Sequence, residues 1–193
     1  MTNKELIERY PFLLPRSVWT DKVYEDFDYS WTVLDEMPDG WRKAFGEMMC
    51  SEIKCELLRF GRKYLNDYRI MEIKEKYASL RWYDNGHPVG SKLGDIIGKY
   101  EALSEHICIV CGKPDVPVTG RGWYMPLCKD CWLSDDQNTE AEWNEYATAE
   151  NNLMMPDVYE YSRYSKEDDK WIDIEIDISD TAEKIRRKWN DSH

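Results

Sequence analysis

The sequence lacks any long hydrophobic stretch. No apolar run approaches the ~20 residues that a helix needs to span a membrane. The first residues, Met-Thr-Asn-Lys-Glu-Leu-Ile-Glu-Arg, are mainly polar and do not resemble the apolar core of a signal peptide. We therefore expect a protein with no membrane partner, located in the reducing cytoplasm, where cysteines remain available for metal ions.

Histidines and catalytic motifs are also scarce. The chain has only three histidines, His87, His106 and His193. It contains no glycine-rich phosphate loop, no Gly-x-Ser-x-Gly motif and no His-Glu-x-x-His motif. The histidines that a His-Asn-His nuclease would use are missing from the segment that follows Cys111. These absences favour a binding protein over an enzyme.

Basic residues are outnumbered by acidic ones. The chain has 26 lysines and arginines against 38 aspartates and glutamates, a net charge of −12. Residues 132–193 hold most of this excess, with 17 acidic and 7 basic side chains. Because non-specific nucleic-acid binding requires neutralisation of phosphates, this balance favours a protein partner over a nucleic acid. The acidic surface either attracts a basic partner or only keeps the protein soluble.

What the sequence does contain is two closely spaced cysteine pairs. Cys108 and Cys111 form one Cys-x-x-Cys pair, and Cys128 and Cys131 form the other. Two such pairs supply the four thiolates of a tetrahedral zinc site, and four protein ligands leave no open position for catalysis. We expect one structural zinc ion. A rubredoxin-type iron site is disfavoured by the lack of a second glycine, and two disulfides by the lack of any sign of secretion.

The two cysteine pairs are not equivalent. Gly112 follows the first pair, where a chain that folds over a metal often needs a positive φ, whereas Trp132 follows the second pair. This asymmetry is typical of a treble clef, in which a knuckle is followed by a β-hairpin and a helix that begins at the second pair. Gly120-Arg-Gly122 predicts the tip of that hairpin.

The same hairpin supports a second interpretation, a nucleic-acid-binding zinc ribbon. Arg121, Trp123 and Tyr124 could stack on a base, and Lys113 and Lys129 could contact phosphates. The alternative is that Trp123 packs beneath the metal.

The remaining cysteines, Cys50 and Cys55, lie five residues apart on a predicted helix, so they face different directions and cannot easily share a metal. We expect both to be buried as small hydrophobic residues, with a redox role as the alternative.

Hydrophobic periodicity and turn residues predict an α+β fold, a small mixed domain of helices and antiparallel hairpins with an integrated treble-clef or zinc-ribbon-like module. We expect Asp39 to cap a long helix and Thr139 with Glu142 to form a capping box. The predicted helices cover residues 3–9, 40–60, 91–105, 139–152 and a C-terminal segment from Asp180. The predicted strands cover residues 27–33, 158–164 and 171–178, together with a hairpin within 69–83 whose Met71, Ile73, Leu80 and Trp82 face inward.

We divide the chain into three parts. Residues 1–104 form an α+β domain, residues 105–135 a zinc module docked on it, and residues 136–193 an acidic helix–hairpin–helix extension. No glycine- or serine-rich linker precedes Cys108, which is why we expect the module to be docked and not tethered.

One predicted strand alternates without error. In Ile172-Asp-Ile-Glu-Ile-Asp-Ile178 the aliphatic side chains face one side, and Asp173, Glu175 and Asp177 face the other. This acidic face is either a solvated surface that prevents edge-to-edge pairing of strands, or a site that binds a cation or mimics phosphates.

Several segments carry a resemblance to a known group of proteins. Residues 37–47, 72–83, 107–114 and 122–128, including Ile107-Cys-Ile-Val-Cys-Gly-Lys-Pro114, resemble a family of small proteins of phages, prophages and gut bacteria, most of them described only as hypothetical. Ala78 stands where the resemblance leads us to expect glycine. The resemblance implies a mobile-element origin, a bacterial host cell and a metal module, and it implies no activity.

These observations together predict a zinc-stabilised interaction or regulatory protein of a phage or mobile element. We expect it to bind a protein target, as a host-directed inhibitor acting through its acidic surface. The alternative is the nucleic-acid-binding zinc ribbon that uses Arg121, Trp123 and Tyr124.

Overall fold

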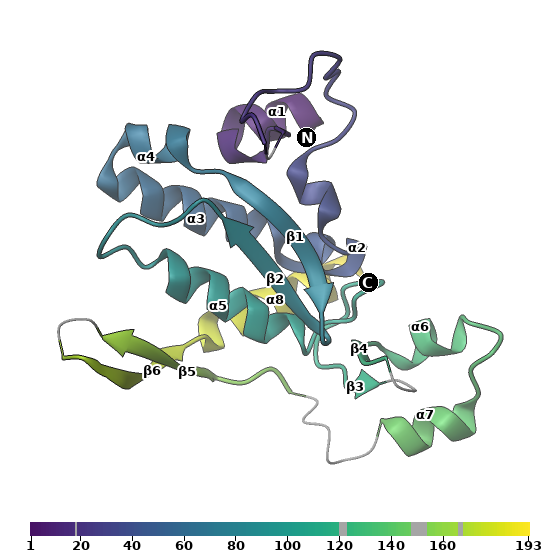
Figure 1. Cartoon of the computed structure of the whole chain (residues 1–193). Coiled ribbons are helices and arrows are strands. Elements are labelled where there is room, and N and C mark those ends of the chain that lie inside the picture. Colours follow the sequence, from purple (N-terminus) through teal and green to yellow (C-terminus); the bar gives the residue numbers. More distant parts are fainter. Residues whose placement is uncertain (18, 120–122, 148–153, 166–167) are drawn as a thin grey trace.

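The computed structural model describes residues 1–17, 19–119, 123–147, 154–165 and 168–193. These residues form helices and three two-stranded antiparallel sheets connected by turns and loops, so the fold is a mixed α+β arrangement (Figure 1). The helices are α1 (Asn3–Arg9), η1 (Pro11–Leu13), η2 (Val33–Glu36), α2 (Asp39–Trp41), η3 (Arg42–Gly46), α3 (Glu47–Phe60), α4 (Arg62–Asp67), α5 (Leu93–Ser104), α6 (Lys129–Leu133), α7 (Glu140–Tyr146) and α8 (Ser179–Ser192). The strands are β1 (Ile70–Lys76), β2 (Ser79–Asp84), β3 (Val118–Thr119), β4 (Met125–Pro126), β5 (Val158–Ser165) and β6 (Lys170–Asp177).

The core is built around one long helical segment, α2–η3–α3. Its apolar side chains recur at helical spacing and are almost fully buried: Trp41, Phe45, Met49, Ile53 and Leu57. The π-helical turn η3 lies in the middle of the segment, and Phe45 stacks on Tyr100 of α5 with ring centroids 5.3 Å apart. The helix predicted over residues 40–60 is confirmed. The prediction that Asp39 caps it is wrong, because Pro38 is the N-cap and no side chain makes a capping hydrogen bond there.

No strand forms over residues 27–33. The Asp28 carboxylate accepts a hydrogen bond from the Ser30 amide (3.0 Å), and Tyr29 between them has a φ of 64°. This Asx turn breaks the extended backbone that the alternating sequence predicts. Thr32 then forms a capping box with Asp35 and begins the 3₁₀ helix η2. Local side-chain-to-backbone bonds therefore override the period-2 pattern, and the prediction is wrong.

The β1–β2 hairpin closes through Tyr77 and Ala78, whose φ angles of 55° and 65° are those of a two-residue type I′ turn. Ile73, Leu80 and Trp82 face the core, as predicted. Met71 does not, since a register shift between Ile70 and Glu72 turns it outward and leaves it 41% exposed. A β-bulge of this kind changes the face of the residues beyond it.

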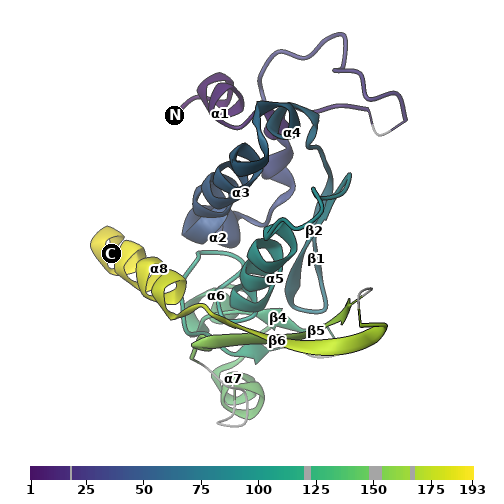
Figure 2. The same ribbon diagram turned by 90° about the vertical axis from the view of Figure 1, so that its left-hand side faces the viewer.

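The β5–β6 hairpin and α8 return the chain to the core. Both strands match the predicted ones. The hairpin crosses beneath α5, and α8 begins directly after β6 (Figure 2). Tyr159 packs so closely on α5 that a Cβ on Gly98 would lie 2.6 Å from its hydroxyl oxygen. Ala182 and Ile185 of α8 are buried. The capping box of Thr139 and Glu142 begins α7 as predicted. The helix ends at Tyr146, earlier than predicted, and residues 148–152 of the predicted helix lie outside the described residues.

One ion pair fastens α8 to the turn after the first cysteine pair. Asp115 accepts two hydrogen bonds from Arg186, at Nε (2.8 Å) and Nη2 (3.0 Å), and a third from the Met155 amide (3.0 Å). Burial raises the pKa of Asp115, but the bonds from Arg186 and Met155 outweigh it and hold the pKa below its ordinary value. We name this three-way contact between Asp115, Met155 and Arg186 the Asp115 clasp.

We expect Asp115→Asn to lower the free energy of unfolding by about 1–2 kcal/mol, because it removes a partly buried charge pair. Asparagine tolerates the positive φ of this position, 55°, so backbone strain does not contribute. The folded-state pKa of Asp115 is lowered, so its stabilising effect is complete above the unfolded-state value of ~4 and disappears as the pH falls through the folded-state value. Urea unfolding at neutral and acidic pH measures both effects.

Glu183→Gln is the matched control, since it removes the exposed Glu183–Arg187 pair of the same helix. Its effect should stay below ~0.5 kcal/mol. An equal loss of stability in the two variants, or a loss in Asp115→Asn that persists at acidic pH, would contradict the clasp.

Candidate metal centre

The first cysteine pair lies on a tight knuckle. The Gly112 amide donates to the carbonyl of Cys108 (2.9 Å), and the Cys108 amide donates to the carbonyl of Lys113 (2.8 Å). Gly112 has a φ of 90°, a conformation that other residues rarely adopt, as the sequence predicts. The knuckle therefore turns Cys108 and Cys111 toward a common point.

The second pair is brought in by the short β3–β4 hairpin and by α6. The Ile109 amide of the knuckle donates to the carbonyl of Pro126 in β4 (2.9 Å). Two residues later Cys128 is the N-cap of α6, and its Sγ accepts the Cys131 amide (3.5 Å). The helix that was predicted to begin at the second pair is present.

The four sulfur atoms form one cluster. The Sγ atoms of Cys108, Cys111, Cys128 and Cys131 all lie within 4.8 Å of one another. Cys111 and Cys128 are 3.7 Å apart, close to the ~3.8 Å edge of a tetrahedron with metal–sulfur bonds of ~2.3 Å. A disulfide needs ~2.05 Å, and all six cysteines of the chain are free. The cluster therefore fits a structural metal ion.

The ionisation of the thiols supports the same conclusion. The Cys128 thiol donates a hydrogen bond to Cys108 and, despite burial, lowers the pKa of Cys108 to about 4, with help from the amides of Val110, Cys111 and Cys128. The shared hydrogen bond and burial raise the pKa of Cys128, and burial above all raises the pKa of Cys131 to about 12. Four thiolates this close together would repel one another unless a cation lies between them.

The module is packed against the start of the core helix. The Gly40 amide donates to the carbonyl of Ile109 (2.9 Å), and Trp41 Nε1 donates to the carbonyl of Ile107 (2.9 Å). A Cβ on Gly40 would overlap the carbonyl oxygen of Cys108, and one on Gly112 would lie 2.7 Å from the Gly40 carbonyl oxygen. The backbones of α2 and the knuckle therefore touch without side chains between them.

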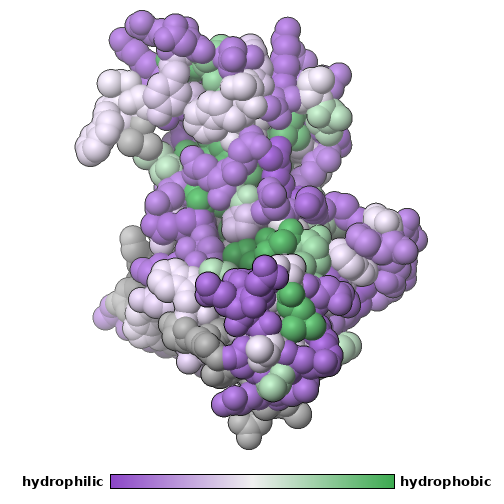
Figure 3. Space-filling view, turned by 90° about the vertical axis from the view of Figure 1, so that its right-hand side faces the viewer, coloured by the Kyte–Doolittle hydropathy of each residue, from purple (hydrophilic) through white to green (hydrophobic). Residues whose placement is uncertain are grey.

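An apolar hollow borders this contact. A cavity of about 500 Å³ lies between the knuckle, η3 and α8, lined by residues that include Ala44, Val110, Ile185 and Trp189. Figure 3, drawn from the side on which the C-terminus lies in Figure 1, shows hydrophobic atoms gathered at mid-height and hydrophilic ones around them. Lys188 Nζ donates to the carbonyls of Lys43 (2.5 Å) and Ala44 (3.2 Å) at its rim. Polar contacts, and not continuous apolar packing, join α8 to the core here.

The proposed nucleic-acid residues are only partly brought together. Trp123 and Tyr124 are 67% and 61% exposed, so the alternative in which Trp123 packs beneath the metal is wrong. Lys113 is exposed, Lys129 pairs with Glu140, and Arg121 lies outside the described residues. Close to the second cysteine pair it is Trp132 of α6, and not Trp123, that is buried, 5% exposed.

The sequence analysis did not identify the residues that lie beside Trp123 and Tyr124. The tip of the β1–β2 hairpin supplies Glu75, Lys76 and Tyr77, which line a cavity of about 320 Å³ together with these two aromatic side chains. Tyr77 is 80% exposed. The turn signal at this tip is visible in the sequence, but its proximity to the second hairpin is a long-range contact that no local pattern reveals.

The acidic residues of β6 lie where they were predicted. Asp173, Glu175 and Asp177 are exposed, while Ile172, Ile174 and Ile176 are half-buried. The register adds Glu160 of β5 directly opposite Glu175, a partner that the sequence analysis did not identify.

The other two cysteines differ from each other. Cys50 is fully buried, and burial raises the pKa of its thiol, as expected of a small core residue. The expectation for Cys55 is wrong, because it lies on the exposed side of α3.

Comparison with protein-family models, with curated proteins and with solved structures gives no match for this chain. Among the described residues, none of the helices combines the length and the apolar character that crossing a membrane requires.

We expect the purified protein to carry one metal ion per chain and Cys128→Ser/Cys131→Ser to lose it, because two thiolates cannot complete the tetrahedral shell. Residues 105–135 should then become sensitive to proteases, and the melting temperature should fall. Elemental analysis, limited proteolysis and thermal unfolding measure these effects.

Cys55→Ser is the matched control, since this exposed thiol lies outside the cluster. It should leave metal content and melting temperature unchanged. Full protease resistance in the double variant would show that the cluster does not need a metal to fold.

Proposed function

We propose that this chain is a zinc-stabilised interaction or regulatory protein of a phage or mobile element, acting on a protein target in the cytoplasm of a bacterial host. In this proposal one zinc ion fills the four-cysteine cluster, and the knuckle, the β3–β4 hairpin and α6 form a treble-clef-type module. The order of these elements along the chain and the tetrahedral spacing of the sulfur atoms support it. The metal would hold the scaffold and take no part in chemistry.

The acidic face of the β5–β6 hairpin is the observation that most strongly supports the proposed binding of a protein target. Cross-strand neighbours share a face, so Glu160, Asp173, Glu175 and Asp177 all project to the side away from Ile172, Ile174 and Ile176. Among the paired residues of β5 and β6 that the structure describes, no basic side chain shares this face, which ends at Trp171, 68% exposed.

Such a face is unfavourable in the free protein. Glu160 and Glu175 are directly opposite each other, and like charges in that position destabilise a sheet. Ser162 donates to Asp173 (2.7 Å) and Ser179 donates to Asp177 (2.6 Å), so two of the carboxylates are held in place by hydroxyl groups. A basic partner would relieve the repulsion, and an exposed tryptophan is the kind of residue that contributes most to protein interfaces. A host-directed inhibitor that mimics phosphates would present the same surface.

We expect Asp173→Asn/Glu175→Gln/Asp177→Asn to lose the protein partner that the wild-type chain retains in affinity purification from host cells. The hairpin itself should remain folded, because the substitutions remove repulsion and no apolar contact. Quantitative mass spectrometry of the recovered proteins measures the loss.

Glu8→Gln/Asp136→Asn/Asp191→Asn is the matched control, since it removes three exposed carboxylates from other parts of the surface. Equal recovery of the partner by the wild type and the β6 variant would rule out this face as the binding surface.

A second candidate is a nucleic-acid-binding protein, favoured by the exposure of Trp123, Tyr124 and Tyr77 around one cavity. Aromatic side chains on exposed hairpin tips are typical stacking platforms for unpaired bases. The net charge of −12 opposes this candidate, because the chain as a whole repels phosphates.

If this candidate is correct, Trp123→Ala should weaken binding of a single-stranded oligonucleotide by roughly tenfold, because a base–aromatic stack contributes about 1–3 kcal/mol. Arg121→Glu should weaken it as well, and the affinity of the wild type should fall steeply with salt. Fluorescence anisotropy measures all three. Trp19→Ala, at a tryptophan 92% exposed elsewhere, is the control, and absence of binding at low salt would exclude the candidate.

A further inference from the structure

A second group of exposed aromatic side chains lies at the other end of the molecule. We name residues 19–31 the aromatic loop. Trp19, Tyr24, Tyr29 and Trp31 are 92%, 49%, 42% and 37% exposed. The loop lies beside α1 at the top of Figures 1 and 2, whereas α6 and α7 lie at the bottom. It is therefore separate from the metal module and from the acidic face of β6.

The rings are arranged around Phe27. Its ring centroid lies 4.9 Å from that of Tyr29 and 6.5 Å from that of Trp31, and Tyr24 lies 6.4 Å from Trp31. Phe27 is partly buried against the core, so the rings form a connected platform and not a set of independent side chains. Exposed apolar surfaces of this kind commonly mark sites of protein interaction.

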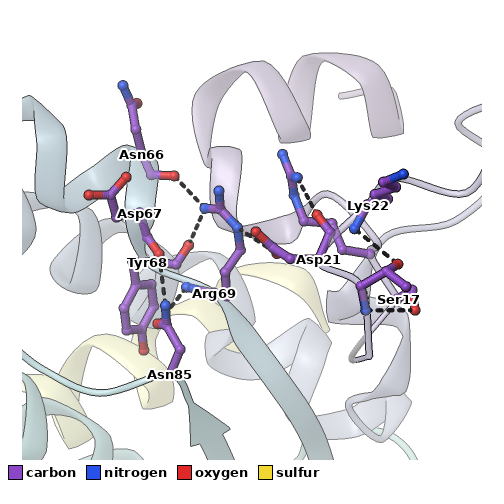
Figure 4. A network of polar contacts seen from close by, with 10 residues as sticks. Ser17, Asp21, Lys22, Asn66, Asp67, Tyr68, Arg69 and Asn85 are labelled. Carbon is purple, nitrogen blue, oxygen red and sulfur yellow. Dashed lines mark hydrogen bonds and ion pairs between the residues drawn. The ribbon is translucent and has the colours of Figure 1, made fainter.

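The start of the loop is fixed by a polar network (Figure 4). Arg69 pairs with the carboxylate of Asp21 (3.4 Å) and donates to the carbonyls of Asn66 and Tyr68. Arg16 Nη1 donates to the carbonyl of Asp21 (2.8 Å). The segment before Tyr24 is thus attached to the connection between α4 and β1.

The end of the loop is fixed to α1. Asn3 Nδ2 donates to the carbonyls of Tyr29 (3.1 Å) and Ser30 (2.9 Å), and the capping box at Thr32 follows at once. The start of the loop is therefore fastened to the α4–β1 connection and its end to α1, which reduces the entropy lost when a partner orders the loop.

The surface between the rings is negatively charged. A cavity of about 490 Å³ is lined by Tyr24, Glu25, Asp26, Phe27, Asp28, Ser30 and Trp31, three of which are carboxylates and none of which is basic. A hydrogen bond from Ser30 holds the pKa of Asp28 below its ordinary value, so this carboxylate is charged at neutral pH. Phosphate-bearing ligands would be repelled here.

We propose that the aromatic loop docks a basic segment of a partner protein, with arginine preferred over lysine. A guanidinium group stacks on tyrosine and tryptophan rings and forms bidentate hydrogen bonds with carboxylates, and this surface offers both within one cavity. The inference goes beyond the proposed function, because it assigns a second surface and the chemistry of the segment that binds it.

The test uses the full-length protein and a short end-blocked peptide in which arginine and glycine alternate. Two further peptides carry lysine or the uncharged analogue citrulline in place of arginine. Anisotropy of the labelled peptides gives the affinities, and NMR spectra of the protein report on the indole N–H groups of Trp19 and Trp31. We expect saturable binding in the order arginine, lysine, citrulline, with the Trp31 indole signal shifting.

Variants of the loop, compared with a variant that changes the charge elsewhere, distinguish binding at the loop from a general effect of net charge. Glu25→Gln/Asp26→Asn/Asp28→Asn should weaken arginine-peptide binding by about tenfold or more, and Tyr24→Ala/Trp31→Ala should do the same without changing the charge. Glu8→Gln/Asp136→Asn/Asp191→Asn makes the same change in charge at exposed positions elsewhere and should leave the affinity within about twofold. Because these are surface positions, unchanged melting temperatures check that each variant is folded.

Three outcomes would overturn the proposal. If the two carboxylate variants weakened binding of the arginine peptide equally, the effect would be one of net charge and not of the loop. Absence of indole shifts at saturating peptide would place the site elsewhere. Self-association of the wild type that Tyr24→Ala/Trp31→Ala abolishes would make a second copy of the chain the occupant. None of them depends on the acidic face of β6, so the proposed function and this inference can fail separately.

Discussion

The close approach of α2 to the first cysteine knuckle is the constraint on which the rest of the structure depends. Gly40 lies against the carbonyls of Cys108 and Ile109, where any Cβ would overlap the backbone. Gly112 faces Gly40 from the opposite side, so two glycines from distant parts of the chain meet at one contact. Trp41, the next residue, is fully buried and donates to the carbonyl of Ile107. The core helix and the metal cluster are therefore positioned by the same few atoms, and a change in one is transmitted to the other.

The Asp115 clasp attaches the C-terminal segment to the residues that follow the knuckle. Asp115 follows the knuckle, Arg186 belongs to α8, and Met155 begins the segment that leads to the β5–β6 hairpin. α8 also contacts η3 through Lys188, so the C-terminal segment spans the joint between the core and the metal module. A structural metal ion in the cluster would thus stabilise more than its own loop, because the elements that surround the cluster are fastened to each other as well as to it.

The sequence correctly predicted those elements that are specified by neighbouring residues or by a long periodic row of apolar side chains. The helix of residues 40–60, the β1–β2 hairpin and the cysteine pairs all belong to this group, since each is encoded within a few turns of chain. The wrong predictions have separate causes. An Asx turn at Asp28 overrode an alternating pattern, a bulge turned Met71 outward, and Trp123 projects into solvent although tryptophans are usually buried. Sequence spacing also could not reveal that Tyr77 and Trp123 line one cavity, because their proximity depends on how the module docks.

Exposed aromatic and acidic side chains occur together on surfaces that lie in different parts of the molecule. The aromatic loop and the acidic face of β6 both combine carboxylates with exposed tryptophan, whereas the surface around Trp123 includes Lys76 as well as Glu75. Charges at opposite ends of the molecule are screened from each other over a Debye length of ~8 Å at physiological salt, so each surface would attract a cationic partner largely independently of the other. Both surfaces are attached to the core, the aromatic loop through Asn3 and Arg69 and the β5–β6 hairpin through the packing of Tyr159 on α5. The core would therefore fix the distance between two such partners, or between two basic regions of one partner. In the proposed function, a zinc ion in the four-cysteine cluster would stabilise the frame that holds these surfaces at a fixed separation.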